Sequence, residues 1–131
     1  MNRELSSMNQ NVRVVVANRP RLMRELVLET IAEHPDIQIV AELHNEEEIV
    51  HIVEGTHPDV LIIALDDSNT RPTICDTLLH RYPGLRILAL APERNRSILY
   101  WASIDIHSSP VEASQDGVLS ALRNKDQYVG D

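Results

Sequence analysis

The chain has 131 residues and a formal net charge of −8, from 12 Lys and Arg against 20 Asp and Glu. This length fits one domain with its own core, and a hydrophobic fraction of 43% is typical of a folded protein. The acidic balance argues against nucleic-acid binding by this domain alone, because phosphate backbones attract clustered cations. We find no apolar run long enough to span a bilayer and no signal peptide, so we expect a cytoplasmic protein with no membrane partner.

Reactive and metal-ligating residues are few. Cys75 is the only cysteine, which excludes an internal disulfide, and with no base motif beside it we expect a packed residue and not a reactive thiol. Glu48 and His51 are spaced like half of a carboxylate metal motif, but the other half is missing. We therefore predict no metal and no cofactor. Eleven of the basic residues are Arg, and the one Lys is Lys125.

The predicted elements alternate between strands and helices along the chain. Short runs of β-branched and aliphatic residues predict strands at 12–16, 37–41, 60–65, 85–91 and 104–107. Helical spacing of apolar residues predicts helices at 21–34, 45–55, 72–81, 94–102 and from 109 or 110 to about 124. Asn45 is the predicted cap of the second helix. Residues 1–11 are predicted to be a flexible tail, 12–124 the domain, and 125–131 a second tail.

This alternation predicts an α/β protein with a parallel sheet and helices on both of its faces. In open sheets of this kind, ligands and chemistry lie beyond the carboxyl ends of the strands. The residues that decide the function are therefore expected in four short segments: 17–20, 64–67, 91–93 and 106–109.

Four stretches carry a resemblance to a known family: VRVVVANRPRLMREL at 12–26, HPDIQIVAELHNEEEIV at 34–50, HPDVLIIAL at 57–65 and YPGLRILAL at 82–90. They resemble the CheY-like receiver domains of response regulators in two-component, or phosphorelay, signal transduction. The subgroup most similar to this chain usually precedes a LuxR-type helix-turn-helix. The resemblance implies a flavodoxin-like, doubly wound sheet of five parallel strands in the order 2-1-3-4-5, in a three-layer α/β/α arrangement.

The residues that receivers use for phosphotransfer are missing from the matching positions. The family places an acceptor Asp at the end of the third strand, where this chain has Ala64, and a methyl group cannot take a phosphoryl group. The acidic pair that holds Mg²⁺ corresponds to Asn18 and Arg19, and the hydroxyl residue corresponds to Ala91. The Lys of the fifth strand corresponds to Ile106 or His107. The resemblance therefore implies a pseudo-receiver with a degenerate phosphorylation pocket and no enzymatic activity.

Charged residues around this pocket allow more than one interpretation. We predict that Arg19 forms an ion pair with Asp66 or Asp67 and fills the vacated metal site. A displaced phosphoacceptor at Asp66 or Asp67 is the less favoured interpretation, because no metal pair or Lys would stabilise the developing charge. The alternative function is a small-molecule-binding α/β domain that uses Asn18, Arg19 and Asp66 at the strand ends.

The predicted fourth helix and the segment after it carry a candidate interaction face. Large aromatic residues are enriched at protein interfaces, and complementary charges can pair across a symmetric dimer. The expected partner is a protein: a second copy of the chain in a homodimer, a kinase, or another regulator. Packing of Trp101 into the core is an equally supported alternative. The residues of this predicted face are Arg94, Arg96, Tyr100, Trp101 and Glu112.

Overall fold

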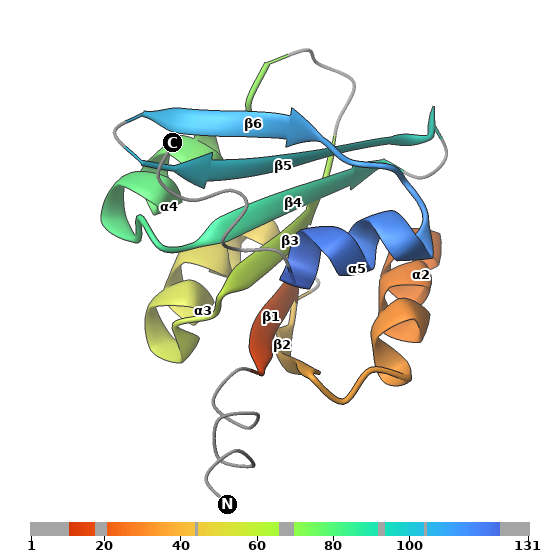
Figure 1. Cartoon of the computed structure of the whole chain (residues 1–131). Helices are drawn as coiled ribbons and strands as arrows, with labels where there is room; N and C mark the ends of the chain where they lie inside the picture. Colours follow the sequence, from red (N-terminus) through yellow and green to blue (C-terminus); the bar gives the residue numbers. More distant parts are fainter. Residues whose placement is uncertain are drawn as a thin grey trace, which may run out of the picture.

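The computed structural model describes residues 11–17, 21–43, 45–65, 70–91, 94–103 and 105–123. Figure 1 shows their helices and strands in chain order. The elements are β1 (Val12–Ala17), α2 (Arg21–Ala32), β2 (Ile37–Glu42), the 3₁₀ turn η1 (Glu46–Glu48), α3 (Ile49–Thr56), β3 (Val60–Ala64), α4 (Thr73–Arg81), β4 (Arg86–Ala91), β5 (Arg96–Ala102), β6 (Ile106–Pro110) and α5 (Gln115–Arg123).

The strands form one six-stranded sheet in the order β2-β1-β3-β4-β5-β6. The pairs β1–β2, β1–β3 and β3–β4 are parallel, whereas β4–β5 and β5–β6 are antiparallel. The α/β class and the order of the first four strands are confirmed. The sheet is mostly parallel and compatible with a flavodoxin-like fold, but the predicted five-stranded order 2-1-3-4-5 is not matched, because an additional strand lies next to β4.

That additional strand, β5, replaces the helix predicted at 94–102, which was wrong. Residues 98–101 are Ile, Leu, Tyr and Trp, residue types that favour strands. Their alternation places Leu99 on one face of the sheet and Tyr100 on the other, and both are buried. Asn95, just before β5, has a left-handed backbone conformation with a φ of 55°, which Asn tolerates better than most residues. This conformation lets the chain reverse and return antiparallel to β4.

The C-terminal elements also differ from the prediction. The last strand is Ile106–Pro110 and not 104–107, and the last helix begins at Gln115 and not at 109 or 110. Ser114 fixes that start, because its Oγ accepts a hydrogen bond of 3.1 Å from the backbone N–H of Gly117.

Earlier in the chain, the Oδ1 of Asn45 accepts a hydrogen bond of 2.9 Å from the N–H of Glu47, but this bond caps the 3₁₀ turn η1. The predicted helix start at Asn45 was wrong, because α3 begins at Ile49 and its N-cap residue, Glu48, makes no side-chain capping bond. The helix that follows ends at Thr56 and not at 55. His57, with a φ of 50°, takes the left-handed position after the helix.

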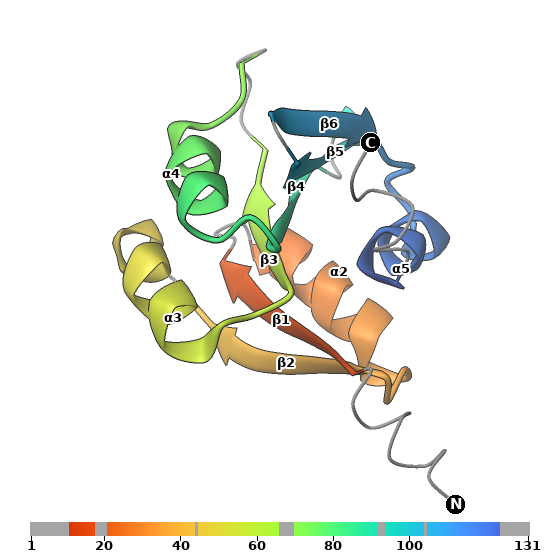
Figure 2. The ribbon, with the colours of Figure 1, turned by 60° about the vertical axis from the view of Figure 1, so that its left-hand side comes forward.

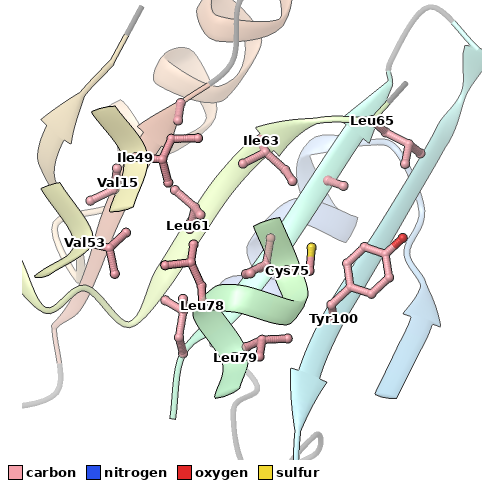
Figure 3. Packing of buried hydrophobic residues seen from close by; sticks show 14 of the residues in the cluster. Val15, Ile49, Val53, Leu61, Ile63, Leu65, Cys75, Leu78, Leu79 and Tyr100 are labelled. Atoms are coloured by element: carbon pink, nitrogen blue, oxygen red, sulfur yellow. The ribbon is translucent and has the colours of Figure 1, made fainter. Parts of the chain in front are cut away.

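Helices cover both faces of the sheet, with α3 and α4 on one side and α2 and α5 on the other (Figure 2). Figure 3 shows buried side chains packed between the sheet and α3 and α4. This α3/α4 core contains Val15, Ala17, Leu43, Ile49, Val53, Leu61, Ile63, Leu65, Cys75, Leu78, Leu79, Leu85, Ile87, Ala89, Ala91 and Tyr100. The α2/α5 core on the opposite face contains Val12, Val14, Val16, Val27, Ile31, Ile37, Val60, Ile62, Leu88, Leu90, Leu99, Val118, Ala121 and Leu122. Among the described residues, no helix is long and apolar enough to cross a membrane.

Candidate functional site

The carboxyl ends of β1, β3 and β4 meet at one edge of the sheet. The register pairs Ala17 with Ile63 and Ala64 with Leu90, so the ends of the three strands lie beside one another. Ala17 and Ala91 are buried, and Ala64 is half-buried. The structure therefore brings Ala64 and Ala91 to the same edge, where the sequence predicts the degenerate pocket. Small aliphatic side chains, and no carboxylate or hydroxyl, end these three strands.

A guanidinium group lies over this edge, and it belongs to Arg94. Its Nη2 donates a hydrogen bond of 3.1 Å to the carbonyl oxygen of Leu65, the residue that follows Ala64. The backbone N–H of Leu65 in turn donates to the carbonyl of Leu90 across 2.8 Å. Arg94 therefore contacts the backbone directly after the end of β3. The sequence could have indicated this position, because Arg94 follows Ala91, the last residue of the predicted fourth strand, by only three residues. The helix predicted at 94–102 led us to place Arg94 on an interaction face instead.

His107 does not lie at this edge. It pairs with Trp101, and the neighbouring Tyr100 pairs with Ile87 near the start of β4. The carboxyl end of β6 is instead occupied by Ser109 and Pro110. The assignment of His107 to the pocket was wrong because it assumed a parallel fifth strand that ended at 107.

The remaining predicted pocket residues, Asn18, Arg19, Asp66 and Asp67, lie outside the described residues. The predicted ion pair among them stays a prediction, as does the predicted use of Asn18, Arg19 and Asp66 for a small ligand.

The predicted interaction face is not a single surface. Tyr100 is only 4% exposed and belongs to the α3/α4 core, so it cannot present its ring to a partner. Trp101 packs against the opposite core and is half-buried. Arg96 begins β5 opposite Ala91, whereas Glu112 is exposed between β6 and α5. The grouping relied on a helix that the structure replaces with a strand, in which successive side chains point to opposite faces.

Trp101 has a specific neighbour on β6. Its ring is stacked on His107, with the ring centroids 5.3 Å apart and the planes inclined by 20°. The Nε2 of His107 lies 2.7 Å from the hydroxyl oxygen of Ser103. The β5–β6 hairpin is therefore held by side-chain contacts as well as by its ladder.

A cleft of about 530 Å³ lies between α4 and the β5–β6 turn, and Arg71, His80 and Asp105 are among its lining residues. The Nε of Arg71 lies 2.6 Å from Oδ1 of Asp76. This contact lowers the pKa of Asp76 below its ordinary value, mainly through the hydrogen bond from Arg71. The positive charge of Arg71 in the lining of the cleft is thus already compensated by the carboxylate of Asp76.

Cys75 belongs to α4, and its fully buried side chain lies between this helix and the sheet, beside Tyr100 in Figure 3. Burial raises the pKa of its thiol to about 12, because the thiolate would lose its hydration. The expectation of a packed, unreactive cysteine agrees with this environment. Among the described residues, no group of three or more His, Cys, Asp or Glu side chains is placed to hold a metal ion.

The fold and the sheet edge together define the class: an α/β domain with a mostly parallel sheet. Over 85 residues the chain is 28% identical to the transcriptional regulatory protein DegU of Brevibacillus brevis. The similar region covers 63% of this chain and 36% of that protein, so the chain matches only about a third of its relative. No protein-family model matches the chain. The similarity supports a receiver-like domain.

Proposed function

We propose that this chain is an atypical receiver domain that takes no phosphoryl group and acts in signal transduction through contact with other proteins. The observation that carries the proposal is the end of β3, where Ala64 takes the acceptor position and Arg94 bonds to the carbonyl of the next residue. The similarity to a transcriptional regulatory protein supports the signalling role.

The chemistry of phosphotransfer explains why this arrangement supports a pseudo-receiver. The reaction needs a nucleophile, and the methyl group of Ala64 offers no lone pair. It also needs cations placed around the transferred phosphoryl group. The guanidinium of Arg94 is already bonded to the backbone of Leu65. A domain without an acceptor would therefore act independently of phosphorylation.

Such a domain is not an enzyme, and its output comes through a protein partner. We expect the partner to be a kinase, another regulator or a second copy of the chain, and we expect the domain to work in the cytoplasm with these signalling proteins. The domain boundaries of 12–124 and the similarity to the LuxR-type subgroup are part of the same proposal.

The test uses acetyl phosphate and Mg²⁺, with intact-mass spectrometry and amide NMR spectra as readouts. We expect no gain of a phosphoryl group and no shift of the resonances at the carboxyl edge of the sheet. A receiver known to accept acetyl phosphate, treated in the same way, is the positive control. A phosphorylated wild-type chain would overturn the proposal.

A restored acceptor makes the test sharper. The variant Ala64→Asp supplies the carboxylate, and we expect it to stay unphosphorylated, because a nucleophile without its metal ligands and Lys has no stabilised transition state. If this single change brings back phosphorylation, the rest of the pocket is intact, and the proposed loss of the whole pocket is wrong.

A further inference from the structure

We propose that the free edge of β6 pairs antiparallel with the same edge of a second copy, which joins two sheets across a twofold axis centred on Ser108. This inference rests on the proposed function and names its partner surface. Among the described residues, β6 is the last strand of the sheet, and no strand pairs with its outer side.

The hydrogen bonds at the two ends of the β5–β6 hairpin decide which backbone groups face outward. The N–H of Val111 donates to the carbonyl of Ser97 across 3.0 Å, and the N–H of Ser103 donates to the carbonyl of Asp105 across 2.8 Å. The register between them is unbroken from Ile98↔Pro110 to Ala102↔Ile106. Bonded and non-bonded pairs alternate in an antiparallel ladder. Residues 107 and 109 therefore bond to β5, whereas residues 106, 108 and 110 direct their backbone groups to the free edge.

Pro110 occupies one of these outward positions. A proline has no N–H, so it is tolerated at an edge strand only where that N–H would not join the ladder, and position 110 meets this condition. The outward side of β6 thus offers donors and acceptors at Ile106 and Ser108 and an acceptor alone at Pro110.

A second copy of β6 complements this pattern. With the twofold axis at Ser108, the N–H and C=O of Ser108 exchange hydrogen bonds with the partner's Ser108. The N–H of Ile106 then donates to the carbonyl of the partner's Pro110, and the reverse bond forms on the other side of the axis. Every outward N–H of β6 thus finds an acceptor. Because Pro110 has no N–H, only the hydrogen bond to the carbonyl of the partner's Ile106 does not form. A twofold axis placed at any other residue of β6 would pair fewer residues of the two strands.

The side chains of β6 allow this approach. Exposed edge strands are commonly protected by charged residues, and β6 carries none, although 24% of the chain is charged. On the face toward α4, Ile106 would lie beside the partner's Pro110. On the face toward α5, His107 would lie beside the partner's Ser109. No charged side chain of one β6 opposes a like charge on the other, and the apolar contact of Ile106 with proline adds to the backbone bonds.

The oligomeric state of the full chain tests this pairing, measured by sedimentation velocity and light scattering from micromolar to near-millimolar concentration. We expect a monomer–dimer equilibrium. In Ser108→Lys, two ammonium groups meet at the axis, and we expect the dissociation constant to rise by about tenfold or more. Ser108→Thr keeps the backbone groups and adds only a β-branched side chain suited to a strand, so the dimer should persist.

A second variant addresses the backbone bonds directly. Ser108→Pro removes the central outward N–H without removing a bond to β5, and it should also yield a monomer, with circular dichroism as the check on folding. A wild-type chain that stays monomeric, a dimer that survives Ser108→Lys, or equal loss of the dimer in Ser108→Thr would overturn the inference. A monomer that also takes no phosphoryl group would overturn the pairing and leave the proposed function intact.

Discussion

The Nη1 of Arg86 donates a hydrogen bond of 2.8 Å to the carbonyl oxygen of Ala121, which joins the start of β4 to the last turn of α5. Arg86 is only 3% exposed. Carbonyls in the last turn of a helix lack intrahelical partners, and a cation there is also favoured by the helix dipole. This contact lets α5 end against the sheet without leaving a buried acceptor unsatisfied.

Removing this guanidinium should destabilise the domain. We expect Arg86→Ala to lower the free energy of unfolding by about 3 kcal/mol, since a buried acceptor loses its donor and a cavity forms. Arg86→Met keeps most of the volume and should cost less, about 1–2 kcal/mol. Urea denaturation of the three proteins measures both values. Equal stability of wild type and Arg86→Ala would contradict the role of this contact.

Gly117 gives a second prediction, because the backbone of the preceding loop lies against it. A Cβ at this position would stand 2.0 Å from the carbonyl oxygen of Glu112. Alanine normally favours a helix over glycine by about 1 kcal/mol. Here we expect the opposite: Gly117→Ala should lower the free energy of unfolding by about 2 kcal/mol or more, because the loop must move. Ser120→Ala, at an exposed position of the same helix, is the matched control and should change stability by less than about 0.5 kcal/mol.

The parts of the fold that could be predicted are the segments whose apolar pattern in the sequence agrees with the burial of the same residues in the structure. The strands β1, β3 and β4 are apolar runs that are almost fully buried, so their place in the middle of a parallel sheet follows from composition. The edge strand β2 is largely half-buried or exposed, and only its alternating apolar residues indicated a strand. Residues 94–102 lack such a clear signal. Ile98 to Trp101 favour a strand, but their apolar residues also suit a buried helix, and pairing with β4 decides between the two.

The same ambiguity limited the prediction of the candidate site. Ala64 and Ala91 could be placed at the carboxyl edge because each ends a strand with an unambiguous pattern. Arg94 and His107 depended on the path of the chain between β4 and α5. Because that segment forms a hairpin, Arg94 lies at the carboxyl edge, where it was not predicted, and His107 lies away from the edge, where it was predicted. Long-range pairing of this kind is not encoded in the spacing of nearby residues.

Cys75 gives a prediction about reactivity. Its thiol is fully buried, and its raised pKa of about 12 leaves almost no thiolate at neutral or mildly alkaline pH. We expect Ellman's reagent to react very slowly with the folded chain at about pH 8 and rapidly after denaturation in urea. The rate in the folded state should then report opening of the domain. A native rate close to that of the denatured chain would show that the thiol is not buried between α4 and the sheet.

The contact between Asp36 and Arg123 makes stability depend on pH in a defined direction. The Nε and Nη2 of Arg123 donate to the two carboxylate oxygens of Asp36 across 2.8 and 2.9 Å, and Nη2 also lies 3.2 Å from Nδ1 of His34. The hydrogen bond from Arg123 lowers the pKa of Asp36 below its ordinary value of 3.8. A carboxyl whose pKa is lower in the folded state stabilises the fold above its unfolded pKa, and this contribution disappears as the pH falls through the folded pKa.

Because both side chains are more than a third exposed, the contribution should stay below about 1 kcal/mol at neutral pH. We expect Asp36→Asn to lower the free energy of unfolding at about pH 7 and to differ progressively less from the wild type as the pH falls towards about 2 and Asp36 takes up a proton. Urea denaturation at both pH values measures the difference. In an Arg123→Met background, Asp36→Asn should have no such effect, because the donor is gone.

The control for a looser surface pair is Glu54→Gln. The carboxylate of Glu54 lies 4.0 Å from Arg81, so this variant should change stability less. A difference between wild type and Asp36→Asn that is the same at both pH values would show that the ion pair does not contribute to folding.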